Sequence, residues 1–376
     1  MNGGKCQMKI YRVIGLMSGT SLDGVDVALL ETDGDSHIER EAFLSVPYDA
    51  ALRADIRACF GALPDKLDDK AKTVARGLTE VHARAVQKLL AERSLAANDI
   101  DLIGFHGQTV SHAPDKGYTC QIGDGNLLAE MTGIQVVSDF RTADVKAGGQ
   151  GAPLVPVYHQ ALAAAQEKPL VFLNIGGVAN VTYIGENGEL IAFDTGPGNA
   201  LIDDWMLSKT GQSCDEGGKT ALSGKADAAL LKQLLAHPFF ETEPPKSLDR
   251  GAFGSEAWKH LDVADGAATL ASFTVESIVR AARHFPAQPK QWVVAGGGRH
   301  NAFLMQKLQE KLGVPVRSID ALGLNGDATE AEAFAYLAVR SVRGLPLSFP
   351  MTTGVPEPVT GGRLHTVEAC QEKKCR

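Results

Sequence analysis

GLMSGTSLDG (residues 15–24), NIGGVANVT (174–182) and VVAGGGRHN (293–301) are three glycine-rich turns, each fed by a short apolar run typical of a strand. Glycine permits positive φ and lets backbone N–H groups approach an anion with no Cβ in the way. One such turn is as readily an ordinary tight hairpin. Three of them, spread from residue 15 to residue 301, predict two lobes that close on one phosphate-bearing ligand.

Length and charge narrow the class of protein. The chain has 376 residues, more than one hydrophobic core usually supports, so two domains are expected. Its net charge of −8 argues against nucleic acid or an anionic membrane surface as the main partner, since both require a basic patch. The sequence contains no run of membrane-span length and no signal-like apolar core. The six cysteines form no C-x-x-C pair, so we expect a reduced, cytoplasmic protein.

Strand-like and helix-like patterns alternate along the chain, which indicates an α/β fold with mixed, largely parallel sheets. Strands are expected at 10–17, 25–31, 101–105, 118–122, 134–139, 170–175, 190–194, 291–296 and 315–319. Helices are expected at 73–90, 266–284, 301–312 and 328–343. Glycines and two prolines interrupt the pattern after residue 139, so the predicted domains are 1–142 with a return at 350–376, and 143–349.

Motif searches exclude two common nucleotide sites. The chain has no G-x-x-x-x-G-K-[ST], and no G-x-G-x-x-G follows a strand to open a helix. The hydroxyls of Thr20 and Ser21 lie beside Gly19 and Gly24, where they can supplement backbone donors around a triphosphate.

Asp194, in FDTGPGN (193–199), is the candidate general base, because a strand would hold it while the following turn opens space for substrate. Capping of that turn is the alternative role. His106 directly follows a predicted strand, and either touches substrate or completes a hydrogen-bond network. Arg141 either clamps an anionic group or pairs with a neighbouring aspartate. Glu330 either faces the ligand cleft or stabilises the dipole of its helix.

Seven motifs taken in order resemble those of the anhydro-N-acetylmuramic acid kinase family: GLMSGTSLDGVDVAL, GFHGQTVSH, QIGDGNLLAE, VVSDFRTADVKAGGQGAPLVP, NIGGVANVT, FDTGPGNALIDDW and GGGRHN. The resemblance extends from residue 10 to residue 365. It implies two ribonuclease H-like lobes around a nucleotide cleft, as in the actin-like, hexokinase-like and Hsp70-like ATPases. It also implies a bacterial enzyme that uses ATP, Mg²⁺ and water to convert 1,6-anhydro-N-acetylmuramic acid to N-acetylmuramic acid 6-phosphate in cell-wall recycling.

The resemblance also implies roles for individual residues. Asp194 matches the catalytic base, and His106, Thr109, Arg141 and Glu330 fall in sugar-binding motifs. The expected ATP contacts are Gly19, Thr20, Ser21, Leu22, Asp23, Gly24, Val25, Asp26, Gly176, Gly177, Asn180, Gly296, Gly297, Gly298 and Asn301. Many members of the wider superfamily carry an aspartate before their glycine turns, whereas Leu16 and Asn174 stand at those positions here. We therefore assign Mg²⁺ no protein ligand.

Two other functions remain open at this stage. A glycosidase or lyase would open the anhydro bridge without ATP and would need a second acid, for which Glu330 is the candidate. A nucleotide-binding sensor on the same scaffold would bind ATP without turnover. The sequence leaves open whether the chain forms a homodimer.

Overall fold

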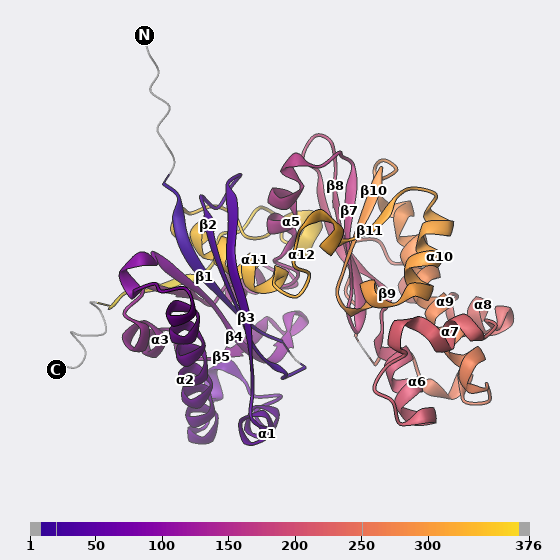
Figure 1. Ribbon diagram of the computed structural model, residues 1–376, viewed down its shortest axis with the longest axis horizontal. Coiled ribbons are helices and arrows are strands. Elements are labelled where there is room, and N and C mark those ends of the chain that lie inside the picture. The colour runs from indigo at the N-terminus through magenta and orange to yellow at the C-terminus, as the bar shows by residue number, and fades with distance from the viewer. Residues whose placement is uncertain (1–8, 20, 250, 368–376) are drawn as a thin grey trace, which may run out of the picture. The chain divides into compact units, whose positions relative to one another are not determined.

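The computed structural model describes residues 9–19, 21–249 and 251–367, which form two compact units (Figure 1). Unit 1 comprises the described residues up to Ala164 together with those from Ala328 onward, and unit 2 comprises those from Ala165 to Asp327. The sequence-based boundaries, 142/143 and 349/350, differ from this division. Residues 328–349 belong to unit 1 because helix α11 (Thr329–Val342) packs on the first sheet. Residues 143–164 belong to it as well, through contacts of α4 (Thr142–Lys146) with β5 (Tyr118–Ile122) and of α5 (Pro156–Leu162) with α11.

The sheet of unit 1 has the strand order β12-β6-β4-β1-β2-β3, with β5 paired to β4. Its strands are β1 (Tyr11–Ser18), β2 (Gly24–Thr32), β3 (Ile38–Pro47), β4 (Leu102–Ala113), β5 (Tyr118–Ile122), β6 (Val136–Ser138) and β12 (Arg363–His365). The β1–β4 and β4–β6 pairs are parallel, and β1–β2, β2–β3, β4–β5 and β6–β12 are antiparallel.

Helices cover both faces of this sheet (Figure 1). The helices of unit 1 are α1 (Ala50–Ala58), α2 (Asp69–Glu92), α3 (Gly125–Thr132), α4 (Thr142–Lys146), α5 (Pro156–Leu162), α11 and α12 (Pro350–Thr353). Of these, α2, α3, α4 and α11 pack on the strands. Helix α2 buries Leu78 and Val86 in the same core as Ile14 and Leu16 of β1. On the other face α11 comes so close that a Cβ on Gly15 would lie 1.8 Å from the Ala331 carbonyl oxygen.

Unit 2 repeats the plan with the strand order β11-β10-β7-β8-β9. Its strands are β7 (Leu170–Ile175), β8 (Val178–Ile184), β9 (Leu190–Pro197), β10 (Gln291–Ala295) and β11 (Val316–Ser318). Its helices are α6 (Ala200–Thr210), α7 (Lys219–Ser223), α8 (Ala228–Leu234), α9 (Val263–Ala281) and α10 (Ala302–Leu312). Here β7–β10 and β10–β11 are parallel, and β7–β8 and β8–β9 are antiparallel.

The predicted α/β fold with two mixed sheets is confirmed, although more of each sheet is antiparallel than the alternation suggested, because each unit begins with a three-stranded meander. Two strands also extend past their predicted ends. Strand β4 runs through His106 to Ala113, because its second half pairs with β5 from Gln108 onward, and Gly107 has φ +72° where the pairing with β1 becomes irregular. Strand β9 runs past Asp194 to Pro197, and Thr195 is the extra residue of a bulge, since Asp194 and Gly196 pair with the consecutive residues Asn180 and Ala179.

None of the helices that the structure describes is both long and apolar enough to cross a bilayer.

Candidate active site

The β1–β2 turn is held by a buried polar cluster that reaches across three strands. The Ser18 hydroxyl donates to Gln108 Oε1 at 2.6 Å and accepts from the Tyr48 hydroxyl at 2.7 Å. Gln108 Nε2 donates to the Gly19 carbonyl oxygen at 3.2 Å. All three side chains are at most 4% exposed. The start of the turn is therefore fixed by β4 as well as by its own hairpin.

The remaining residues of this turn divide into buried and exposed positions. Leu22 adopts φ +61° with its side chain in the core, and Val25 is buried beside it, so either could contact a ligand only through its backbone. Ser21 and Asp23 are exposed, and Asp26 is half-buried. Thr20, an expected ATP contact, lies outside the described residues.

The turn glycines fall into two classes when a Cβ is placed on each. In the first class the added atom would overlap protein atoms, so packing alone requires glycine: Gly24, Gly198, Gly296 and Gly298. In the second class the nearest described atoms lie 3.5 Å or farther from the added Cβ and φ is not positive: Gly19, Gly176, Gly177 and Gly297. Nothing in the described packing demands glycine at this second set.

A polar row crosses the sheet of unit 2 at the start of β8. Asn174 of β7 pairs with Asn180 of β8, which pairs in turn with Asp194 of β9. All three are half-buried, whereas most of their strand neighbours are buried. Directly opposed residues on adjacent strands project from the same face of a sheet. The predicted base and the predicted ATP contact Asn180 therefore lie side by side.

Asp194 is fixed by a segment that the sequence did not single out. Its backbone N–H donates to the Lys246 carbonyl oxygen at 3.0 Å, and the Leu248 N–H donates to its Oδ2 at 2.8 Å. Burial raises the pKa of the Asp194 carboxyl to about 6, against the opposing hydrogen bond from Leu248. A carboxylate with a pKa near the working pH is suited to general-base chemistry.

The third glycine turn joins β10 to α10. A Cβ on Gly296, whose φ is +73°, would lie 2.4 Å from Asn174 Oδ1, so this turn packs directly against the polar row. Arg299 donates from Nη1 to the Gly296 carbonyl oxygen at 3.0 Å and from Nε to Asp320 at 2.9 Å. Asn301 accepts from the Leu304 N–H and so caps α10, which commits its side-chain oxygen to the helix.

Three of the four predicted sugar contacts interact in unit 1. Arg141 Nε donates to His106 Nε2 at 3.0 Å, and His106 Nδ1 lies 2.8 Å from the Gly107 carbonyl oxygen. His106 is therefore neutral, with Nδ1 carrying the proton. Burial and the charge of Arg141 hold the pKa of His106 well below its usual range.

Arg141 also lies near an acid. Burial lowers the pKa of Arg141 to about 10, and the charge of Glu330 opposes that shift. Glu330 reaches the surface at the start of α11, yet the surrounding protein raises the pKa of its carboxyl, with Arg141 opposing and Asp26 reinforcing the shift. The alternative role of Arg141, pairing with Asp139 or Asp144, is supported in part, because the charge of Asp144 also raises the pKa of Arg141. The hydrogen bond from Arg141 Nη1 goes instead to the Gly151 carbonyl oxygen, at 2.8 Å.

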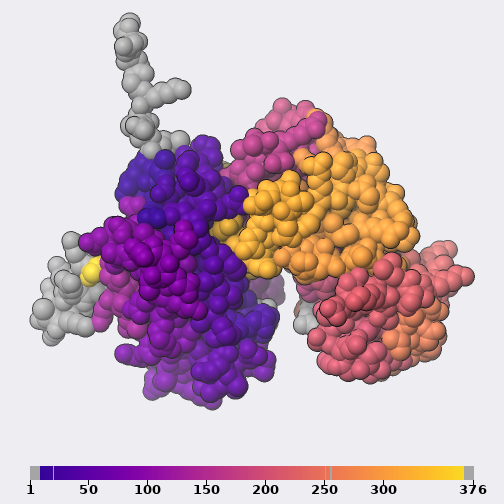
Figure 2. All heavy atoms as spheres, in the orientation of Figure 1, coloured from indigo at the N-terminus to yellow at the C-terminus, as the bar shows by residue number. Residues whose placement is uncertain are grey.

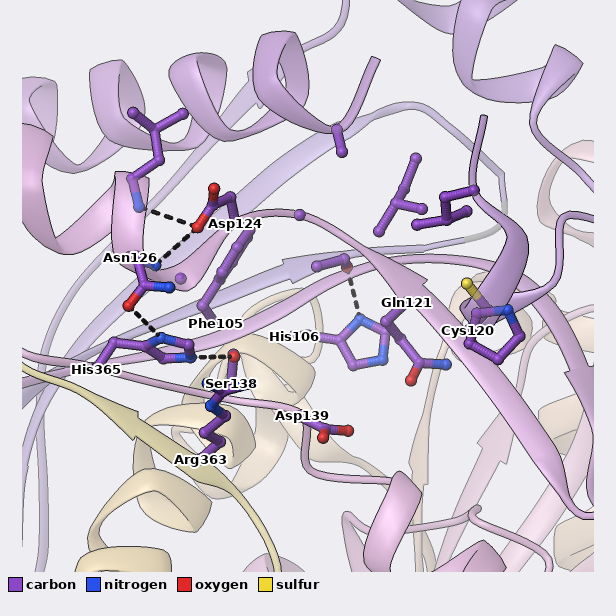
Figure 3. A pocket seen from close by; sticks show the side chains of 18 of the residues that line it. Phe105, His106, Cys120, Gln121, Asp124, Asn126, Ser138, Asp139, Arg363 and His365 are labelled. Carbon is purple, nitrogen blue, oxygen red and sulfur yellow. Dashed lines mark hydrogen bonds between the residues drawn. The ribbon is translucent and has the colours of Figure 1, made fainter. Parts of the chain in front are cut away.

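A pocket of about 630 Å³ opens beside His106 within unit 1 (Figure 3). Its wall includes Gln121 and the start of α3. On one side His365 bridges two other lining residues, with Nε2 at 2.9 Å from the Ser138 hydroxyl and Nδ1 at 3.0 Å from Asn126 Oδ1. Thr109 does not line this pocket; its hydroxyl accepts from Gln121 Nε2 at 3.2 Å.

Several residues near the site were not predicted from the sequence, although most of them lie in or beside the quoted motifs. Ser18 and Gln108 stand inside quoted motifs but have no distinctive spacing, and Arg299 follows a glycine run as any surface arginine could. Leu248 acts through its backbone, which no side-chain pattern reports. Asp139 adopts φ +58° at the pocket rim, a conformation that is uncommon outside glycine and often marks functional sites.

The two strand orders and the glycine turns after β1 and β7 define a two-unit α/β protein of ribonuclease H-like topology. The model of one family, described as anhydro-N-acetylmuramic acid kinase, matches residues 11–366. The chain therefore belongs to the anhydro-N-acetylmuramic acid kinase family.

Individual relatives agree with the family match. The anhydro-N-acetylmuramic acid kinase of Rhizorhabdus wittichii is 53% identical over 358 residues, covering 94% of this chain and 98% of the relative. That of Rhodospirillum rubrum is 52% identical over 350 residues, covering 93% and 92%. Among solved structures, ligand-bound xylulose kinase from Lactobacillus acidophilus aligns at 10% identity with a TM-score of 0.47, over 97% of both chains.

Proposed function

We propose that this chain is a kinase that opens 1,6-anhydro-N-acetylmuramic acid with water and phosphorylates O6 from ATP. The product is N-acetylmuramic acid 6-phosphate, formed in cell-wall recycling. Membership of the anhydro-N-acetylmuramic acid kinase family supports the substrate and the reaction.

The observation that carries the proposed mechanism is the setting of Asp194. Its carboxyl is half-buried in a polar row, is held by the Leu248 N–H, and has a pKa of about 6. Such a group is mostly ionised at neutral pH and accepts a proton readily. Asp194 is therefore assigned as the general base.

The second class of glycines supports nucleotide binding. Gly19, Gly176, Gly177 and Gly297 have room for a Cβ in the protein alone, so their lack of a side chain is best explained by the close approach of a ligand. Backbone N–H groups of such turns bind phosphate oxygens. Gly24, Gly296, Gly298 and Asn301 are assigned supporting roles, because packing or capping already accounts for them.

Sugar recognition is assigned to His106, Arg141 and Glu330 of unit 1. Arg141 donates from Nε to His106 and from Nη1 to the Gly151 carbonyl oxygen, so Nη2 can donate to an anionic or hydroxyl group of the sugar. The pocket beside His106 is large enough for part of an amino sugar. Thr109 is assigned an indirect role through Gln121, which lines that pocket.

The chemistry requires water because O6 of the anhydro sugar is tied to C1 and carries no proton for an ordinary kinase base to remove. Asp194 takes a proton from a water molecule as that water attacks C1. The C1–O6 bond breaks, and the electron pair left on O6 attacks the γ-phosphorus in line, with ADP leaving. Backbone N–H groups of the glycine turns stabilise the charge that develops on the phosphoryl oxygens.

Mg²⁺ would neutralise phosphate charge and would enter with ATP. The residues of the chain fit a nucleotide-borne ion rather than one held by the protein. Leu16 is buried in the core and Asn174 offers only an amide, so neither turn is preceded by a carboxylate.

Labelled water tests the proposal. The protein is mixed with Mg-ATP and the anhydro sugar in ¹⁸O-water, and the product is analysed by mass spectrometry. We expect one ¹⁸O at C1 and none in the O6–phosphate link. Ring opening without ATP would instead indicate a glycosidase, and ATP binding with no product would indicate a sensor. Label at O6 would refute attack at C1.

A further inference from the structure

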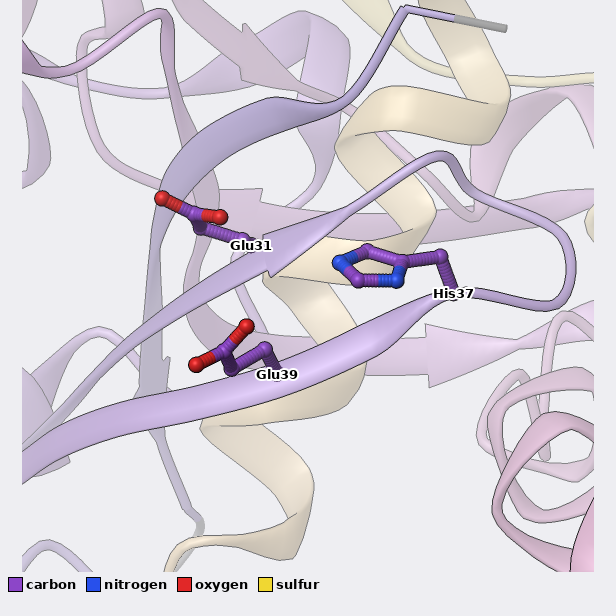
Figure 4. A group of neighbouring side chains, drawn as sticks. All are labelled: Glu31, His37 and Glu39. Carbon is purple, nitrogen blue, oxygen red and sulfur yellow. The ribbon is translucent and has the colours of Figure 1, made fainter. Parts of the chain in front are cut away.

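The hairpin of β2 and β3 carries a cluster of three metal-ligating residues to which none of the roles described above is assigned: Glu31, His37 and Glu39. One ligand atom from each lies within 4.8 Å of the others. Figure 4 shows the His37 imidazole extending toward the two carboxylates. The first strands of the chain, indigo in Figure 2, form part of the surface of unit 1.

Strand register explains why these side chains meet. Glu31 of β2 is the direct cross-strand partner of Glu39 of β3. His37 stands two residues before Glu39, so both project from the same face of the hairpin. The position of His37 is fixed by its backbone, since its N–H donates to Asp33 Oδ1 at 3.0 Å and its carbonyl oxygen accepts from the Thr32 hydroxyl at 2.6 Å.

Two independent observations favour a cation at this cluster. Glu31 and Glu39 are like charges in directly opposed positions, an arrangement that destabilises a sheet. His37 Nε2 is buried and has no hydrogen-bond partner, which costs free energy unless something binds it. Arg12 lies opposite Glu31 on β1 and attracts its charge, but the hydrogen bonds of its guanidinium go to both carboxylate oxygens of Glu41.

We propose that Glu31, His37 and Glu39 bind one divalent first-row cation, with Zn²⁺ as the representative ion, and that this ion ties the edge strand β3 to β2. An imidazole nitrogen with two carboxylates is a donor set that zinc accepts, with water completing the tetrahedron. Zinc holds such ligands at roughly 2.0–2.2 Å. Small rotations of the two glutamate side chains bring donors at the observed separation onto one ion. The site is independent of the kinase reaction.

Zinc binding is measured by calorimetry on the full chain after treatment with a chelator. We expect one equivalent to bind, and His37→Ala to weaken binding at least tenfold. His260→Ala is the matched control, because His260 is an exposed histidine elsewhere on the surface, and its affinity should equal that of the wild type. Exposed Cys214 is common to all three proteins. Equal affinity in wild type and His37→Ala, or no binding by the wild type, overturns the proposal.

A second variant gives a readout that a merely structural role would not move. Glu39→Gln removes the like-charge pair, so the metal-free variant should melt at a higher temperature than the metal-free wild type. With Zn²⁺ the order should reverse, because only the wild type retains all three ligands. Circular dichroism melting records both orders. A variant that gains as much from Zn²⁺ as the wild type contradicts the site.

Discussion

Units 1 and 2 have matching strand orders, and in each a glycine-rich turn follows the first strand. The residues that surround this turn differ between the two units. In unit 1 the turn after β1 is clamped by the buried cluster of Ser18, Gln108 and Tyr48. In unit 2 the turn after β7 borders a half-buried polar row that ends at Asp194. Near the matching end of the first sheet, the row reads Met17, Asp26 and Ser45. The same strand order therefore supports a turn held by buried hydrogen bonds in unit 1 and a half-buried polar row with a carboxylate in unit 2.

Asp194→Asn, in the polar row of unit 2, should have the largest effect on turnover. Loss of the base should lower kcat by about 10³-fold or more, since asparagine cannot accept the proton. ATP binding, measured by calorimetry, should be unchanged. Asp227→Asn, which alters a carboxylate that caps α8 in the same unit, is the control and should leave kcat unchanged. An Asp194→Asn protein with a tenth of wild-type turnover would remove Asp194 from the mechanism.

Arg141→Lys tests sugar recognition in unit 1. Lysine keeps the charge but cannot bind His106, Gly151 and a ligand at once, so KM for the sugar should rise about 10- to 100-fold. KM for ATP should stay constant. Arg340→Lys, at a buried arginine that binds the Gly34 and Pro346 carbonyl oxygens, should lower stability without changing either KM. Steady-state kinetics with each substrate varied will show whether the two KM values separate.

The two glycine classes make opposite predictions within unit 2. Gly177→Ala should melt like the wild type, because the added methyl makes only an ordinary contact with Ala200 Cβ, at 3.6 Å. It should raise KM for ATP about tenfold, because the same methyl would meet the ligand. Gly198→Ala would force a Cβ to 2.2 Å from the Gly176 carbonyl oxygen and should cost roughly 1–3 kcal/mol. Melting curves and ATP kinetics on both proteins decide the matter. If Gly177→Ala destabilises as much as Gly198→Ala, the distinction between the classes fails.

Asp194 should also leave a mark on stability. Its pKa is about 6 when folded and near 3.8 otherwise, so the folded state binds a proton more tightly, and wild-type stability should fall as pH rises from 4 to 6. At pH 7 Asp194→Asn should therefore be more stable, by on the order of 3 kcal/mol. Trp205, Trp258 and Trp292 all lie in unit 2, so fluorescence during urea unfolding reports this unit. A difference that does not shrink at pH 4 would rule out titration of this carboxyl.

Tyr48→Phe should have the smallest effect. It removes one hydrogen bond to Ser18 and leaves the aromatic packing, which should cost about 1 kcal/mol. The melting temperature from calorimetry measures this loss. Because the clamp positions the β1–β2 turn, KM for ATP should rise slightly, whereas Tyr183→Phe, in the core of unit 2, should leave it unaltered.

Local patterns predicted most elements of the fold. The hairpin of β1 and β2, helix α2 and helix α10 followed from apolar periodicity and turn residues, because the forces that form them act between near neighbours. The unit boundary did not follow, since α11 joins the first sheet through contacts with Gly15 and Gly104, which lie far away in the chain. The extension of β4 past His106 depends on pairing with β5, which periodicity does not report.

The candidate site was predictable where a residue type carries the chemistry. Asp194, His106 and Arg141 were singled out in the sequence because carboxylate, imidazole and guanidinium groups at the ends of predicted strands are conspicuous, and their roles stay predictions. Glycines required by packing could be told from the others only in the structure, because the sequence does not show which atoms surround each glycine. The backbone donor of Leu248 and the carbonyl that Arg299 holds have no sequence signal at all.

Unit 2 is an uninterrupted insertion in unit 1, and this order of segments constrains biosynthesis. The ribosome finishes the entire second sheet before it reaches α11, whose backbone fills the space left by Gly15 and Gly104. The face of the first sheet that α11 covers therefore stays exposed until α11 has been synthesised. Unit 1 is thus the first to begin synthesis and the last to complete its fold, and its exposed apolar sheet face is where a chaperone would bind.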